Sequence, residues 1–299
     1  MNPLPRVTIN RWDELLEELE PLKGWLFRGH GSADWQLRST LERCTPPGGN
    51  PVAAEIDIFR EFQRSAHNYV DATKTPNTPG DWMALMHHVG APTRLVEFTA
   101  SPFVAAYFAF AEIPADDSKQ CAIIAIRPEW CHEQIGKAVF DKGGLFGFKI
   151  DVIKAAVLGL KSGGWESAPK EFAAGSLMSA QIERHALEAA GDVLAVFEPQ
   201  RVSERMSIQQ SAFLWPGRVD KTIGDILDGL GDLREGICEF AMPTSERTRA
   251  VEQLRRMNVT RASLFPGPDG FARSGKYLTV RESEKSRALR AVIRELNKG

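Results

Sequence analysis

Apolar residues recur at helical spacing in several stretches of the chain. The first stretch places four of them on one face of a helix: Trp12, Leu15, Leu16 and Leu19. Asn10 caps this predicted helix, with Asp13 three residues later, and Pro21 follows its end. Four further helices are predicted at residues 50–69, 81–89, from Pro102 onward and 244–257. Helices are therefore expected in both halves of the chain.

Short apolar and alternating runs between the helices predict strands. They cover residues 25–27, 93–99, 122–126, 193–197, 213–215 and 237–241. Within the second run, alternation places Thr93, Glu97 and Thr99 on one face of the strand, and it places Arg94 on the other. Strands and helices follow one another without a regular βαβ period, so the pattern favours the α+β class.

Residues 1–299 are expected to form a single domain with two helical additions. Residues 140–190 predict a helical insert with glycines in its loops. Residues 277–299 predict a C-terminal amphipathic helix, because apolar residues recur on one face and charged residues on the other. This helix either contacts a nucleic acid or a protein partner, or packs on the body of the domain. Its complete apolar stripe favours packing.

Composition narrows the classes of function. With 43% apolar residues the chain can build a core, which excludes wholesale disorder. It carries 37 basic and 39 acidic residues, a net charge of −2, whereas proteins of duplex DNA usually have a basic excess. The four cysteines are scattered without a CxxC pair, which is typical of a reduced, cytoplasmic protein and offers no metal-ligand spacing. No apolar run reaches the roughly 20 residues of a membrane span, so no membrane contact is expected.

Three polar segments carry the candidate chemistry. In the first, residues 25–32, Arg28 ends an apolar strand and is followed by glycines that would let a ligand approach the backbone. Its planar donor fork would bind an anion or pair with a carboxylate at the edge of the core. The second segment, residues 87–102, holds Glu97 and two threonines on one strand face, which would bind sugar hydroxyls or simply face water. Its two adjacent histidines point to different helix faces, so they do not form a two-histidine metal site.

The third segment, residues 205–217, contains the adjacent Gln209 and Gln210. These glutamines need hydrogen-bond partners if they are buried, and otherwise they are solvated in a turn. Together the three segments resemble the FRG domain, a family named for its Phe-Arg-Gly signature. The resemblance rests on five stretches: Phe27–Gly29, His88–Thr99, Ser101–Ala109, Arg205–Phe213 and Leu264–Ala272.

The resemblance covers a motif-bearing region at residues 25–276, with two departures. The family commonly has Asp-Trp where this chain has Glu97-Phe98, and it has Gly where this chain has Ser211. The order of the segments is also similar to that of ADP-ribosyltransferases of the Arg–Ser–Glu type, which implies a split, bent mixed sheet. In those enzymes the third motif ends in a catalytic glutamate, whereas here it offers Gln209.

These resemblances imply a protein that binds NAD and cleaves its nicotinamide–ribose bond, as a toxin or phage-defence effector with a protein or nucleic-acid acceptor. Three residues would act in catalysis: Arg28, Glu97 and Gln209. Eight would bind NAD: Phe27, Arg28, Gly29, His30, His88, Thr93, Arg94 and Thr99. No metal is expected. Two alternatives stay open: a non-catalytic nucleotide sensor, and a hydrolase or nuclease with His88 and Glu97 as acid and base.

Overall fold

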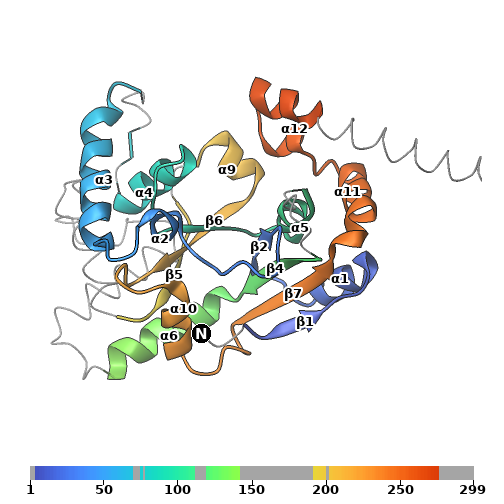
Figure 1. Cartoon of the computed structure of the whole chain (residues 1–299), viewed down its shortest axis with the longest axis horizontal. Helices are drawn as coiled ribbons and strands as arrows, with labels where there is room; N and C mark the ends of the chain where they lie inside the picture. The colour runs from blue at the N-terminus through green and yellow to red at the C-terminus, as the bar shows by residue number, and fades with distance from the viewer. Residues whose placement is uncertain are drawn as a thin grey trace, which may run out of the picture.

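The computed structural model describes residues 4–69, 75–76, 78–111, 119–141, 191–199 and 202–275 (Figure 1). The predicted C-terminal helix at 277–299 lies outside these residues. The predicted helical insert at 140–190 also lies outside them, apart from its first two positions. The described residues build one sheet with helices packed against it (Figure 1).

Seven strands of the described residues form this sheet. They are β1 (Arg6–Thr8), β2 (Leu26–His30), β3 (Val96–Thr99), β4 (Gln120–Ile126), β5 (Leu194–Phe197), β6 (Ser211–Pro216) and β7 (Ile237–Pro243). Their order across the sheet is β1-β7-β4-β2-β3-β6-β5. Only β1 and β7 pair in parallel among these strands, and the other neighbours are antiparallel. The predicted mixed sheet is confirmed, as one continuous sheet.

Helices connect and cover the strands. They are α1 (Trp12–Leu19), α2 (Thr40–Cys44), α3 (Pro51–Ala66), α4 (Pro79–His88), α5 (Pro102–Ala111), α6 (Pro128–Asp141), α9 (Glu204–Ile208), α10 (Ile223–Gly229), α11 (Arg247–Arg256) and α12 (Arg261–Leu264). The hydroxyl of Thr78 accepts from the N–H of Asp81 at 3.1 Å, so α4 begins two residues before its predicted start. The helix predicted at 244–257 is a 3₁₀ turn, Thr244–Glu246, followed by α11.

Apolar side chains fill both faces of the sheet. Helices α1, α5 and α11 pack on the strands β2, β4 and β7, where Phe27, Phe110 and Phe240 are buried. The helices α6 and α10 pack through Trp130 and Ile226 against a second cluster. A third cluster joins α4 and α9 to β5 and β6. This packing fixes the strands that carry the candidate site, and it stabilises them by roughly 25 cal/mol for each Å² of apolar surface buried.

Gly29 lies where α5 crosses β2. A Cβ atom at this position would lie 2.0 Å from the main-chain oxygen of Ala105 and 2.5 Å from the nitrogen of Ala109. No side chain fits in that space, so this glycine allows the helix to approach the strand. We expected it to let a ligand approach the backbone. The side chain that it lacks would point at α5, so helix packing accounts for the glycine, while Gly29 also lines the cavity described below and the approach of a ligand stays a prediction.

Strands β2 and β3 meet at a single residue pair. Phe27 pairs with Thr99, whereas β2 pairs with β4 over its whole length. Beyond this pair the two strands separate, and the main chain of residues 28–30 has no ladder partner on β3. The split sheet that the resemblance implies is therefore not found among the described residues, where one sheet narrows to a single residue pair between β2 and β3. This narrowing creates the space in which the candidate site lies.

Candidate functional site

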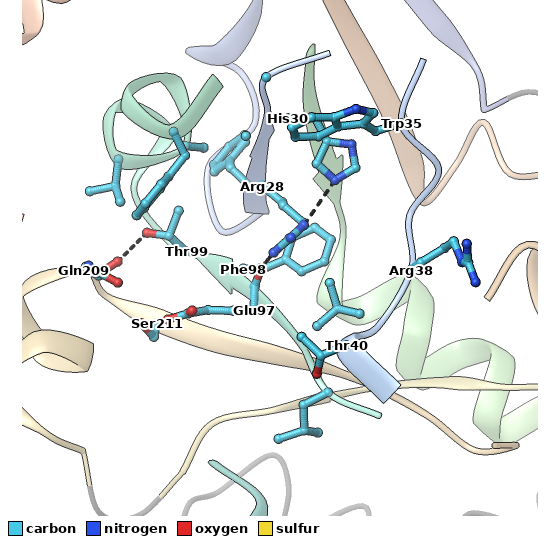
Figure 2. Close-up of a pocket in the computed structure, with 18 of the residues that line it drawn as sticks. Arg28, His30, Trp35, Arg38, Thr40, Glu97, Phe98, Thr99, Gln209 and Ser211 are labelled. Atoms are coloured by element: carbon cyan, nitrogen blue, oxygen red, sulfur yellow. Dashed lines mark hydrogen bonds between the residues drawn. The ribbon is translucent and has the colours of Figure 1, made fainter. Parts of the chain in front are cut away.

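A cavity of about 630 Å³ lies at the separation of β2 and β3 (Figure 2). Residues of β2, the loop after it, α2, β3, α5 and the turn from α9 to β6 line its wall. Four arginines take part in the lining: Arg28, Arg38, Arg43 and Arg205. Two carboxylates, Asp34 and Glu97, also line it, so cations predominate. The volume lies in the range of small-molecule sites, and the charge suits an anionic ligand.

Arg28 bridges the gap between the two strands. Its Nη1 atom donates to the main-chain oxygen of Glu97 at 2.6 Å, and its Nε atom donates to Nε2 of His30 at 3.2 Å. The guanidinium thus replaces the ladder bonds that β2 and β3 lack in this region. Neither of these two contacts neutralises its charge. The predicted alternative is an ion pair between Arg28 and a carboxylate at the edge of the core. It does not account for these two hydrogen bonds, because neither acceptor is a carboxylate.

His30 is held in its neutral form. Burial and the neighbouring charge of Arg28 lower the pKa of His30 to about 3. Its Nε2 atom is therefore a lone-pair acceptor for Arg28 at neutral pH. The imidazole also contacts the indole of Trp35 edge-on, with 6.1 Å between the ring centroids. Trp35 remains 50% exposed and lines the cavity, so His30 fixes both a cation and an aromatic ring.

Glu97 is held in its ionised form. The hydroxyl of Ser211 donates to Oε1 at 2.7 Å, and Nε2 of His87 lies 3.7 Å from Oε2. Burial alone would raise the pKa of Glu97, but the contacts with His87 and Ser211 and the charge of Arg205 lower it to about 2. The carboxylate therefore carries its charge at neutral pH. It keeps 27% of its side-chain surface exposed, so a ligand can reach it.

Thr99 and Gln209 tie the elements of the wall together. The Thr99 hydroxyl donates to the main-chain oxygen of Gln209 at 2.6 Å and accepts from the N–H of Ser101 at 3.0 Å. The buried Gln209 amide donates to the main-chain oxygen of Leu264 at 2.9 Å. Both residues line the cavity, and these bonds connect β3, the turn before β6 and α12. The expected hydrogen-bond partner of a buried glutamine is present.

Three of the predicted site residues do not line the cavity. Arg94 is 1% exposed and forms an ion pair with Glu55 of α3, in which Nε donates to Oε1 at 2.6 Å. Thr93 is fully buried and bonds to Thr40 and to Nδ1 of His87. His88 lies 3.4 Å from the hydroxyl of Ser203. The strand predicted from Thr93 begins only at Val96, so alternation along 93–95 gave no guide to these positions.

The remaining predicted residues lie together around the cavity. They are Phe27, Arg28, Gly29, His30, Glu97, Thr99 and Gln209. Six further lining residues were not predicted from the sequence: His87, Trp35, Arg38, Arg43, Arg205 and Ser211. His87, Arg205 and Ser211 stood inside the singled-out segments, but periodicity did not tell which member of the histidine pair faces the ligand space. Trp35 and the two arginines after it come from a loop and a short helix, which carry no periodic signal.

The described part of the chain holds no group of three or more His, Cys, Asp or Glu residues placed to bind a metal ion. Among the same residues, no helix has the length and apolar character needed to cross a bilayer.

Comparisons with known proteins agree with one part of the motif pattern. Residues 23–118 match the model of the FRG domain. This stretch includes β2, α2, α4, β3 and α5, and with them Arg28, His30 and Glu97. The resemblance of residues 205–213 and 264–272 lies outside the matched range and stays a prediction. Searches of curated proteins and of solved structures gave no significant match. The chain therefore carries an FRG domain at residues 23–118, in agreement with its Phe-Arg-Gly motif.

Proposed function

We propose that this protein binds NAD in the cavity between β2 and β3 and cleaves its nicotinamide–ribose bond. One observation carries the proposal: Arg28, whose Nη1 lies 2.6 Å from the main chain of Glu97, and the ionised Glu97 carboxylate line one cavity. The guanidinium would hold the pyrophosphate of the dinucleotide. The carboxylate would lie at the ribose.

The chemistry of this bond suits a carboxylate that stays ionised. When the bond between C1′ and the ring nitrogen breaks, its electron pair goes to the positively charged ring, so nicotinamide leaves as a neutral molecule without an acid. The ribose carbon acquires oxocarbenium character, which a nearby negative charge stabilises. Water or an acceptor nucleophile then bonds to C1′ and loses its proton to solvent. Glu97 would supply the charge without changing its own protonation state.

A nucleotide sensor without catalysis is the second candidate. It is favoured by Gln209, whose side-chain amide donates to Leu264 and offers no negative charge in the third motif. The hydrolase alternative has less support. His88 does not line the cavity, and a carboxyl group with a pKa of about 2 is a weak base at neutral pH. The acceptor, the toxin or phage-defence role and the cytoplasmic location rest on the resemblances alone.

The deciding experiment is incubation of the purified full chain with NAD, with chromatographic detection of free nicotinamide. The proposal expects release above the uncatalysed rate. Binding of NAD by calorimetry without release would support the sensor. If the protein neither binds NAD nor releases nicotinamide, both candidates are overturned. A control variant, Glu61→Gln, removes an exposed carboxylate from α3, outside the cavity, and should behave as the wild type.

A further inference from the structure

The cavity has a second group of ligand-type side chains that the proposed chemistry does not use. It consists of His30, Trp35, Arg38 and Arg43, which we call the Trp35 lobe. Figure 2 shows Trp35 and His30 on the opposite side of Arg28 from Glu97, Ser211 and Gln209. Arg28 contacts both sides, because it donates to His30 and to the main chain of Glu97. The cavity therefore has two ends joined by one cation.

The Trp35 lobe combines an aromatic surface with positive charge. Trp35 makes a T-shaped contact with His30, yet it stays 50% exposed and lines the cavity, so part of its ring is accessible to a ligand. Arg38 is oriented by a 2.9 Å bond from Nη2 to the main-chain oxygen of Glu42. Arg43 also lines the cavity, and its positive charge contributes to the lowered pKa of His30. An aromatic surface beside several guanidinium groups fits a heterocyclic base that carries phosphate.

The neutral His30 connects these parts. It accepts from Arg28 through Nε2 and hydrogen-bonds the main chain of Trp35. A protonated imidazole at this position would repel Arg28, and a smaller side chain would release both neighbours. His30 is thus a positioning residue that sets the spacing between a phosphate-binding cation and an aromatic ring. This spacing is the arrangement that a nucleotide presents, with its base at one end and its phosphates at the other.

We infer that the Trp35 lobe binds the nucleoside diphosphate half of the ligand, with the base on Trp35 and the phosphates among Arg28, Arg38 and Arg43. The inference deepens the proposed function, because it assigns the ADP half of NAD to this lobe and leaves the nicotinamide ribose at Glu97. The charges agree with this assignment. Arg28, Arg38 and Arg43 line the cavity together with Asp34, and Arg38 also forms a 3.9 Å ion pair with Glu42, so three basic side chains stand against two acidic ones.

ADP tests the inference without any turnover, because it has the base and the diphosphate but no nicotinamide. Calorimetry should show ADP binding to the wild type, and Trp35→Ala should weaken it by about 5-fold or more, the loss of one stacked base. Trp35→Phe should keep most of the affinity. Inorganic pyrophosphate, which has no base, should bind Trp35→Ala as it binds the wild type. Arg43→Ala should weaken both ligands, with the difference shrinking at high salt.

Two control variants match these changes. Tyr69→Ala removes an aromatic ring that is 87% exposed and lies outside the cavity lining, and Arg60→Ala removes an exposed arginine of α3. Neither should alter ADP affinity. The inference is overturned if the wild type does not bind ADP, if Trp35→Ala binds ADP like the wild type, or if that variant loses pyrophosphate to the same degree. ADP binding that depends on Trp35, without nicotinamide release, would uphold the lobe and reject the catalytic proposal. If the wild type releases nicotinamide and Trp35→Ala does so with the same KM for NAD, the catalytic proposal is upheld and the role of the lobe is rejected.

Discussion

The Nη1 atom of Arg28 donates a 2.6 Å hydrogen bond to the main-chain oxygen of Glu97, across the point where β2 and β3 separate. An arginine side chain thus completes the pairing of two strands and lines the cavity between them. The same atom group serves the fold and the proposed ligand. For any substitution of Arg28, both the stability of the fold and the affinity for the ligand should therefore be measured.

For Arg28→Ala, we expect NAD affinity to fall by about 100-fold, the loss of a charge-assisted contact to phosphate. The free energy of unfolding should fall by about 1–3 kcal/mol, because the Glu97 carbonyl loses its donor. Arg28→Lys should not restore affinity, since the donors of an ammonium group lie on one nitrogen and lack the planar spread with which the guanidinium reaches the carbonyl, His30 and a phosphate. Calorimetry and urea denaturation on the same samples give both quantities. Unchanged affinity would exclude the binding role.

For Glu97→Gln, we expect NAD affinity close to the wild type and a fall of about 100-fold or more in nicotinamide release, the loss of one electrostatic stabiliser. Glutamine keeps an oxygen for the Ser211 hydroxyl, so the wall should stay in place. Single-turnover assays separate binding from cleavage. Equal losses of binding and stability would instead assign Glu97 a structural role.

The pKa of Glu97 also predicts how stability depends on pH. This pKa is lowered from 4.5 to about 2 in the folded protein, so the group stabilises the fold above about pH 4.5. Its contribution should decline as the pH falls from about 4.5 to 2. Glu97→Gln lacks this term, so the difference in unfolding free energy between the two proteins should change over that window. Urea denaturation at pH 6, 4 and 3 would check it, and a constant difference would contradict the assigned pKa.

The adjacent histidines offer a matched pair of variants. His87 lies 3.7 Å from the Glu97 carboxylate, whereas His88 does not line the cavity. We expect His87→Ala to raise the pKa of Glu97. As the pH is lowered, nicotinamide release should then decline at a higher pH than in the wild type, and the rate should fall less at pH 7 than at acidic pH. His88→Ala should leave the pH profile of nicotinamide release unchanged. An identical effect of both variants would show that the contact with Glu97 does not matter.

Some features of the candidate site could be predicted from the sequence, and others could not. Alternation along β3 correctly paired Glu97 with Thr99, because the strand is regular there. The partner of Arg94 was not predictable, since Glu55 precedes it by 39 residues and the two meet only when α3 packs on the sheet. Trp35 was missed for a similar reason. Its loop follows β2 without a periodic pattern, and the fold brings it to the cavity wall beside His30.

Arg94 provides the last prediction, because the structure places it outside the cavity wall and in a buried ion pair with Glu55. The two side chains are 1% and 3% exposed. Arg94→Ala should therefore lower the free energy of unfolding by about 3–5 kcal/mol, because it leaves a carboxylate buried without its counter-charge. A double variant, Arg94→Met with Glu55→Leu, removes both charges and should recover much of this loss. Its NAD affinity, measured by calorimetry on folded protein, should equal that of the wild type. If the double variant is stable but has lost NAD affinity, then Arg94 belongs to the binding site after all, as its position in the motif suggested, and the assignment to the fold is wrong.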